Sequence, residues 1–200
     1  METIRGKMSR ELDLAGLVER AAAYRHILLD VGTGDGRFVC EHAARHSGCL
    51  AIGVDACREN LRQHSRTKAG NVLFVIASAQ QLPVELHGLA SHITINFPWG
   101  SLLESLLLAD PALMDGLRLV ARAVASIEIR LNAGALAEAG ATLDNGAANI
   151  VSNLSYAGWH VNAPVPIDSA SLRLFPSTWA RRLAAGCDPR ALLISATLLR

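Results

Sequence analysis

The chain has 200 residues, half of them hydrophobic, and a formal net charge of +1. This length and composition suit one domain with a substantial core, while the small charge excludes a global field for binding nucleic acid and leaves only local patches. The first ten residues lack a signal-peptide core, and no run approaches the roughly 18 apolar residues of a membrane span.

We therefore expect a single cytoplasmic domain over residues 1–200, with residues 1–25 as an N-terminal extension packed on it. The cysteines form no C-x-x-C pair and the histidines show no zinc-ligand spacing, so we expect reduced thiols and no metal site. The four cysteines are Cys40, Cys49, Cys57 and Cys187.

The first expected element is a small hairpin over Thr3 to Arg10, followed by an amphipathic helix from about Asp13 to Tyr24. The helix places Leu14, Leu17, Val18 and Ala21 on one face. Strand-like and helix-like stretches then alternate, which favours an α/β fold with a parallel sheet covered on both faces. The expected strands are 27–31, 50–54, 72–76, 92–97, 124–131, 159–165 and 191–199.

The first core strand leads into a glycine turn. Asp30 ends the strand, and Gly32, Gly34 and Gly36 follow in the order G-x-G-x-G. Dinucleotide-binding folds use G-x-G-x-x-G instead, and an acid in this position would repel a pyrophosphate but attract an amine. S-adenosylmethionine carries an α-amino group and a single ribose, so the turn predicts this cofactor.

A second acid, Asp55, ends the next strand, roughly twenty residues beyond the turn, where such acids bind both ribose hydroxyls. NAD-binding folds place an acid there too, so Asp55 alone does not choose between cofactors. The alternative is that the glycines only relieve a tight turn and that both acids cap helices.

Two loops at strand ends contain tryptophans, and ligands bind at such ends in open α/β sheets. Residues 96–103 (Asn-Phe-Pro-Trp-Gly-Ser-Leu-Leu) contain Trp99, and residues 175–183 contain Trp179. The alternative for each tryptophan is a lid over the core, because a large ring is costly to expose.

With these motifs, most of the chain resembles the aminoglycoside-resistance methyltransferases of the kanamycin–apramycin type, which methylate N1 of adenine 1408 in 16S ribosomal RNA. The resemblance rests on residues 30–36, 79–83 (Ala-Gln-Gln-Leu-Pro), 97–103 and 177–183. It implies a seven-stranded Rossmann-like methyltransferase fold, mostly parallel, with an antiparallel last strand.

The resemblance also implies roles for individual residues. Two tryptophans, here Trp99 and Trp179, would stack on the flipped adenine, with Pro98 shaping the methyl-donor pocket and Ser177 helping to hold the base. The implied S-adenosylmethionine contacts are Asp30, Gly32, Gly34, Asp55, Ala79, Gln80, Pro98 and Ser101. Gln80 departs from the acidic residue typical of the family, and the chain is shorter than its relatives near residues 68–71 and 131–147.

Adenine N1 has an in-plane lone pair and no proton at neutral pH, so it can attack the sulfonium methyl without a general base. Catalysis then depends on positioning in a water-poor pocket. We therefore assign no catalytic base, and we interpret His92 and His160 as structural because each lies in a strand-like stretch.

Arginines supply the expected RNA contacts, since double-helical RNA is recognised by shape and phosphate. Arg58, Arg62 and Arg66 recur at i, i+4 and i+8, which predicts one helix face, and Lys68 lies nearby. Arg181 and Arg182 flank Trp179, and Arg190 follows. A solvated helix face is the alternative. The implied partner is the 30S subunit, with no DNA or membrane partner, and the family suggests a monomer.

The sequence is also compatible with two other functions. A methyltransferase for another RNA or a small molecule would use the same cofactor loop without needing the arginines. A non-catalytic binder of the ribosomal subunit would keep the fold but lack methyl transfer, an interpretation that Gln80 and the shortened loops allow.

Overall fold

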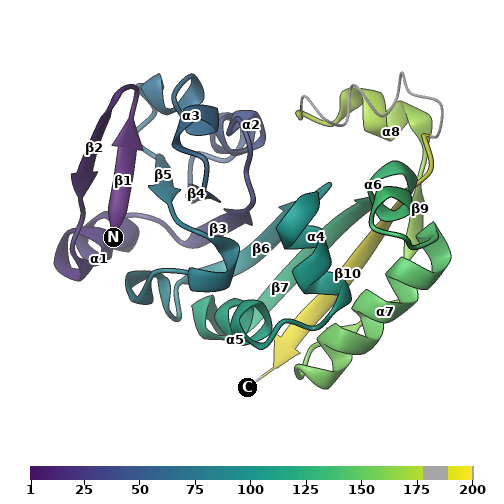
Figure 1. Ribbon diagram of the computed structural model, residues 1–200. Coiled ribbons are helices and arrows are strands. Elements are labelled where there is room, and N and C mark those ends of the chain that lie inside the picture. Colours follow the sequence, from purple (N-terminus) through teal and green to yellow (C-terminus); the bar gives the residue numbers. More distant parts are fainter. Residues whose placement is uncertain (178–188, 200) are drawn as a thin grey trace.

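The computed structural model describes residues 1–177 and 189–199. Within these residues the chain forms one mixed sheet flanked by helices (Figure 1). The strands are β1 (Glu2–Arg5), β2 (Met8–Glu11), β3 (His26–Val31), β4 (Cys49–Asp55), β5 (Val72–Ile76), β6 (Ala90–Asn96), β7 (Ala121–Asn132), β8 (His160–Val161), β9 (Val165–Ile167) and β10 (Ala191–Leu199). The helices are α1 (Leu14–Ala22), α2 (Arg37–Arg45), α3 (Arg58–Leu61), α4 (Gly100–Leu107), α5 (Pro111–Val120), α6 (Ala133–Glu138), α7 (Leu143–Tyr156) and α8 (Ser169–Leu174), with 3₁₀ turns η1 (His64–Arg66), η2 (Ala79–Gln81) and η3 (Val84–Leu86).

The centre of the sheet is parallel, in the order β5-β4-β3-β6-β7. The chain runs from β3 outward to β4 and β5 on one side, and then returns to place β6 on the other side of β3. The carboxyl ends of β3, β4 and β6 therefore meet where the strand order reverses, which is where open α/β sheets bind ligands. The predicted methyltransferase topology is confirmed in this region.

The C-terminal edge differs in part from the prediction. β10 pairs antiparallel with β7, as expected for the last strand. The single strand predicted over 159–165 is wrong, because β8 and β9 pair separately with β10. Pro164 lies between them and has no N–H to donate to a ladder. With this division and the N-terminal hairpin, the described residues form ten strands rather than seven.

The N-terminal segment extends the same sheet. β1 and β2 form the predicted hairpin, and β1 pairs antiparallel with β5 through Thr3 and Val75. Helix α1 begins after Asp13, whose carboxylate accepts the N–H of Gly16 at 2.9 Å.

The predicted apolar face of α1 is only half correct. Leu17 and Ala21 are buried, but Leu14 is 55% exposed and Val18 is 51% exposed. Position 14 is rotated about 60° from position 17 around a helix, so the row through 14 and 18 turns away from the sheet.

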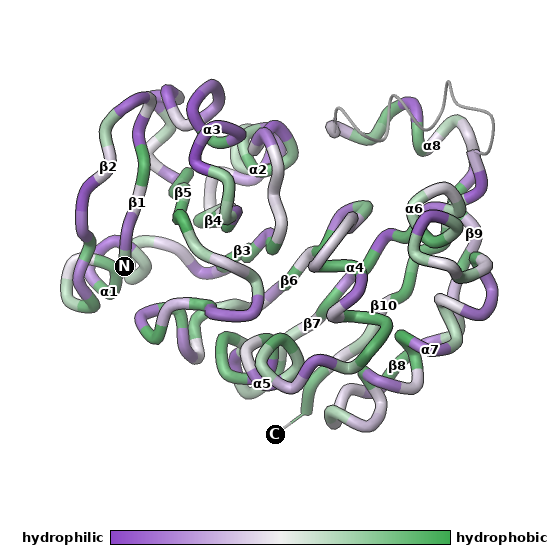
Figure 2. Tube along the Cα trace, viewed as in Figure 1, coloured by the Kyte–Doolittle hydropathy of each residue, from purple (hydrophilic) through white to green (hydrophobic). Residues whose placement is uncertain are grey.

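The core covers both faces of the central strands. Leu28 packs in a cluster with Val39 of α2 and Leu61 of α3, whereas Leu29 packs in a second cluster with Leu103 of α4. Successive strand residues point to opposite faces, so helices cover the sheet on both sides. Figure 2 shows the hydrophobic residues along β5 and β10. None of the helices in the described part of the chain is both long and apolar enough to span a bilayer.

Candidate active site

A cavity of about 440 Å³ opens at the carboxyl ends of β3, β4, β5 and β6. This volume lies within the range of small-molecule sites in proteins. Every residue predicted to contact the cofactor lines this cavity. So do those residues predicted to contact the adenine that lie in the described part of the chain. These lining residues are Asp30, Gly32, Gly34, Asp55, Ala79, Gln80, Pro98, Trp99, Ser101 and Ser177.

The glycine turn keeps its backbone bare on the cavity side. Gly32 has a φ of +72°, and a Cβ there would lie 2.5 Å from Leu102 Cδ2. The Gly32 N–H donates to the carbonyl of Val54 at 2.9 Å, which fixes the turn to the end of β4. Gly36, the residue just before α2, has a φ of +77°. Side chains would not fit these conformations, so the turn requires glycine for its shape as well as for ligand access.

Asp30 lies at the end of β3, only 1% exposed. One carboxylate oxygen accepts hydrogen bonds from Thr94 Oγ1 at 2.6 Å and from Asn96 Nδ2 at 2.8 Å. Burial raises the pKa of Asp30 to about 6, while the hydrogen bonds from Thr94 and Asn96 and the charge of Arg130 oppose this rise. A buried carboxylate surrounded by donors on one side, and open to a cavity on the other, suits a cationic ligand group.

Asp55 lies across the turn, at the end of β4. Its Oδ2 accepts the Gly34 N–H at 2.8 Å, and its Oδ1 accepts the Cys57 N–H at 2.8 Å. Asn60 Nδ2 lies 3.5 Å from the same Oδ1, and Asn60 also lines the cavity. These bonds hold the carboxylate rigidly and leave it remaining acceptor capacity, since a carboxylate offers about four lone-pair sites. That geometry suits a pair of hydroxyl groups.

Gln80 lines the cavity, but its amide is already bonded within the protein. Its Nε2 donates to Ser105 Oγ at 2.8 Å, and its Oε1 accepts from Ser78 Oγ at 2.5 Å. The bond to Ser105 joins η2 to α4, whereas the bond from Ser78 lies within the start of η2. The cofactor contact assigned to Gln80 stays a prediction, and it would have to share or replace one of them.

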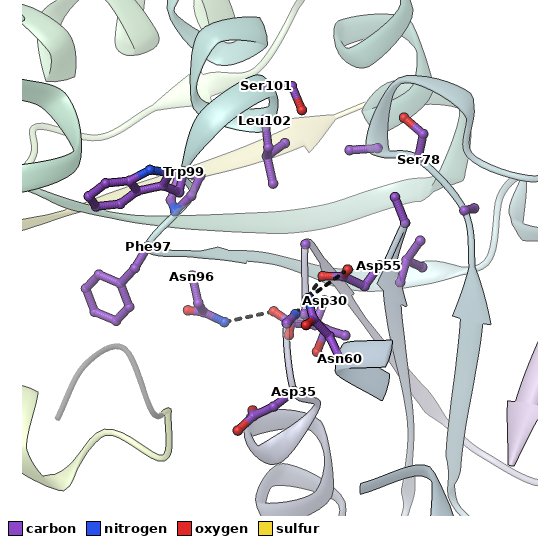
Figure 3. A pocket seen from close by; sticks show the side chains of 18 of the residues that line it. Asp30, Asp35, Asp55, Asn60, Ser78, Asn96, Phe97, Trp99, Ser101 and Leu102 are labelled. Carbon is purple, nitrogen blue, oxygen red and sulfur yellow. Dashed lines mark hydrogen bonds between the residues drawn. The ribbon is translucent and has the colours of Figure 1, made fainter. Parts of the chain in front are cut away.

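The opposite side of the cavity is aromatic. Trp99 lies just before α4 and is 40% exposed, whereas Phe97 is buried with a φ of +53°. Figure 3 shows Trp99 and Phe97 together on one side of the cavity, away from Asp55 and Ser78. Ser177 reaches the cavity from the segment after α8, where its N–H donates to the carbonyl of Phe175 at 2.8 Å. Trp179, Arg181 and Arg182 lie outside the described residues.

The sequence interpretation missed a polar network behind Asp30. Arg130 of β7 donates from Nη1 to Asn96 Oδ1 at 3.0 Å and from Nη2 to Glu128 Oε2 at 2.6 Å. The guanidinium carbon also lies 4.9 Å from the centre of the Phe175 ring. One available signal was the spacing of Thr94 and Asn96, two polar residues that share one face of a buried strand.

The predicted arginine face is wrong as a single helix. Helix α3 ends at Leu61, and η1 follows after a break, so the spacing of four residues no longer aligns the side chains. Arg58 turns back to bond Ser9 Oγ at 3.0 Å and to pair with Glu2. Arg62 pairs with Glu59 at 3.4 Å and is 46% exposed.

The other predicted RNA contacts are on the surface. Arg66, Lys68 and Arg190 are exposed, the first two in the segment before β5 and the third just before β10. The structure thus places Arg62, Arg66 and Lys68 in one surface segment, separate from Arg190.

The two histidines lie away from the cavity lining. The ring Nδ1 of His92 lies 2.7 Å from Ser126 Oγ, and its Nε2 lies 3.9 Å from Glu128. Burial lowers the pKa of His92. His160 is exposed on β8. Neither ring is among the groups that line the cavity.

These features fit S-adenosylmethionine. The buried Asp30 carboxylate matches its ammonium group, the Asp55 carboxylate matches its ribose hydroxyls, and the bare glycine turn lets the ligand approach the backbone. The cavity provides room for both groups because it extends from Asp30 past Asp55 to Ala79.

Comparisons with known proteins agree with this site. The family model described as "NpmA: 16S rRNA (adenine(1408)-N(1))-methyltransferase" matches residues 2–198. An Escherichia coli protein of the same description is 28% identical over 204 residues, covering 93% of each chain. The crystal structure of the 16S rRNA methyltransferase KamB is similar with a TM-score of 0.90 and 27% identity, covering 100% of both chains. A variant of the Catenulisporales acidiphilia enzyme, solved with the cosubstrate SAM, gives a TM-score of 0.87 and 27% identity, covering 100% of this chain and 97% of its own.

Proposed function

The chain belongs to the 16S rRNA (adenine(1408)-N(1))-methyltransferase family, and we propose that it transfers a methyl group from S-adenosylmethionine to N1 of that adenine in the 30S subunit. The main support for the proposal is that two carboxylates at adjacent strand ends and a tryptophan loop line the same cavity. The first part of the cavity suits the methyl donor, and the second suits a flat base.

On the donor side, Asp30 would hold the α-amino group and Asp55 the ribose. The bound S-adenosylmethionine supplies an electrophilic methyl group on its sulfonium. Gly32 and Gly34 keep the turn free of side chains, and Ala79, Gln80 and Ser101 line the rest of the donor cavity. The protein's contribution on this side is to bind and orient the donor.

On the acceptor side, Trp99 would stack on one face of the flipped adenine. Trp179, outside the described residues, would stack on the other face, while Pro98 shapes the pocket between base and donor and Ser177 bonds the base. Each stacked face recovers about 1–3 kcal/mol of the energy lost when the base leaves its helix. Because N1 already carries a lone pair, the site needs no general base, and no histidine lines the cavity in the described part of the chain.

The product explains how this reaction would give aminoglycoside resistance. Methylation places a positive charge on the Watson–Crick edge of the adenine and removes N1 as an acceptor. A cationic drug that hydrogen-bonds this edge would then be repelled and would lose its partner.

The exposed residues Arg62, Arg66, Lys68 and Arg190 would contact ribosomal RNA phosphates, together with Arg181 and Arg182 from outside the described residues. Arg58 is less available for an RNA contact, because its guanidinium already bonds Ser9 and Glu2 of the N-terminal hairpin. We further propose that residues 1–200 act as one monomeric domain, with residues 1–25 packed on it. The pairing of β1 with β5 supports that packing.

The test is transfer of radiolabelled methyl from S-adenosylmethionine to intact 30S subunits and, separately, to protein-free 16S RNA. Primer extension then locates the product. A stop at adenine 1408 that depends on the assembled subunit supports the proposal. Label on another nucleotide, or on no RNA despite cofactor binding, would favour another methyl acceptor or a non-catalytic binder.

A further inference from the structure

We propose that Arg130 is a positioning residue that links the two halves of the site, because it orders both the amide that bonds Asp30 and the aromatic ring that precedes Ser177. This inference rests on the proposed function, since it concerns how donor and base sites are held in register. Arg130 lies on β7, and its side chain is 16% exposed.

The link to the donor side depends on the polarity of hydrogen bonds. A guanidinium only donates, so the Asn96 atom facing Arg130 must be the amide oxygen. The amide nitrogen must then face Asp30, to which it donates at 2.8 Å. Arg130 therefore fixes the orientation of Asn96 and makes it favour the ionised form of Asp30, which is the form that attracts an ammonium group.

The link to the base side depends on ring packing. Phe175 stacks on Phe38 of α2 at 5.3 Å between centres and meets Phe97 edge-on at 5.5 Å. The Arg130 guanidinium lies 4.9 Å from the Phe175 ring centre, within range of a cation–π contact. Ser177 follows two residues later and bonds the Phe175 carbonyl. Arg130 thus helps to position Phe175, and through it the backbone that carries Ser177 after α8.

Other charged groups surround this network. Glu128 of β7 pairs with Arg130 and lies near His92 of β6, while Asp35 and Asp55 line the cavity with Asp30. Among them Arg130 supplies the positive charge that lowers the pKa of Asp30 against its burial. Removing that charge should raise the pH below which cofactor binding weakens.

The experiment compares Arg130→Met with Arg122→Met as a matched control. Arg122 lies on the same strand and bonds a backbone carbonyl, that of Arg25 at 3.2 Å, away from the cavity. Calorimetry measures S-adenosylmethionine affinity between about pH 5 and 8, the interval that spans the raised pKa of a buried carboxyl. We expect about tenfold weaker binding for Arg130→Met at pH 7, as for loss of one charge-assisted hydrogen bond, and a binding midpoint moved to higher pH. Arg122→Met should match the wild type.

A second readout is KM for 30S subunits at saturating cofactor, which should rise for Arg130→Met and for Phe175→Leu. Phe175→Leu should leave the pH midpoint of cofactor binding unchanged. If Arg130→Met does not fold by circular dichroism, Arg130→Gln replaces it, because a neutral amide removes the charge while keeping a polar side chain beside Asn96 and Glu128.

A wild-type pH midpoint in a folded Arg130 variant would overturn the donor half of the inference, and an unchanged KM for 30S subunits would overturn the base half. Failure of the proposed function is distinguishable, because a wild-type protein that labels no 30S subunit still gives the calorimetric comparison.

Discussion

The two sides of the cavity are built in different ways. On the donor side, Asp30 is buried and Asp55 is fixed by two backbone N–H groups. On the base side, Trp99 is 40% exposed and Ser177 lies on a segment held through the Phe175 ring. The donor is a small molecule that is the same in every turnover, so a rigid site lowers its binding cost. The base arrives on a large RNA, and its site has to admit it from outside.

The largest effect should come from Asp30→Asn, which tests the rigid side. Removing the carboxylate leaves the cofactor ammonium without its counter-charge, which should weaken S-adenosylmethionine binding at least about 100-fold, given the roughly 3–5 kcal/mol cost of breaking a buried pair. Calorimetry measures the loss. Binding within about fivefold of wild type would mean that Asp30 does not hold the amine.

Asp30→Asn should also change the pH dependence of stability in the protein without cofactor. The pKa of Asp30 in the folded protein is about 6, against an ordinary value of 3.8, so the folded state binds the proton more tightly. The free energy of unfolding should therefore fall as pH rises from about 4 to 6, because the buried carboxylate ionises over this interval. The total loss at neutral pH is about 3 kcal/mol. Asp30→Asn should thus melt higher than wild type at pH 7 and similarly at pH 4. Equal melting at pH 7 would contradict a strained carboxylate.

The next effect tests the turn on the donor side through Gly36→Ala. A Cβ at Gly36 would lie 2.4 Å from the Phe74 ring, at a φ of +77°. We expect a loss of about 2–4 kcal/mol in the free energy of unfolding from backbone strain and overpacking together. Gly140→Ala is the control, because Gly140 has the same φ of +77° with nothing within 4 Å of a Cβ. If denaturant titrations gave the same loss of unfolding free energy for both variants, the Phe74 ring would have moved aside without an energetic penalty.

Trp99→Ala tests the base side. Loss of one stacking face worth about 1–3 kcal/mol should reduce kcat/KM on 30S subunits by about 5-fold to 150-fold. Trp99→Phe should retain most of the activity, and calorimetry should show wild-type S-adenosylmethionine affinity for both. If cofactor affinity falls in parallel with turnover, Trp99 belongs to the donor side and the division of the cavity is wrong.

The smallest effect tests the docking surface. Arg62→Gln should weaken 30S binding a few-fold and lower the slope of log affinity against log salt by about one, as for one phosphate contact. Arg45→Gln is the matched control, since Arg45 is 65% exposed and pairs with Glu41 at the same 3.4 Å that separates Arg62 from Glu59. Equal salt slopes for the two variants would remove Arg62 from the RNA interface.

The donor side could be predicted because its residues are close in sequence. Asp30 and the three glycines lie within seven residues, and strand, turn and helix follow each other in an order that leaves few alternatives. Asp55 ends the next strand, so its position beside the turn follows from parallel pairing alone. The hairpin over Thr3 to Arg10 was predictable for the same reason, since it is a local structure.

Other predictions were wrong because tertiary contacts overrode the local sequence pattern. The spacing of Arg58, Arg62 and Arg66 suits a helix, yet α3 ends at Leu61 and Arg58 bonds the distant Ser9 and Glu2. The strand predicted over 159–165 is divided because β10 offers partners only on either side of Pro164.

The sequence by itself determined the fold class, the family and the donor-binding loop, because short-range order and a few specific motifs encode them. Only the tertiary structure decided which side chains stand behind that loop. Asn96, Arg130 and Phe175 come from three separate elements, and a hydrogen bond from Arg130 and its contact with the Phe175 ring join them. Such long-range contacts depend on how strands and helices are placed, and no spacing along the chain records that placement.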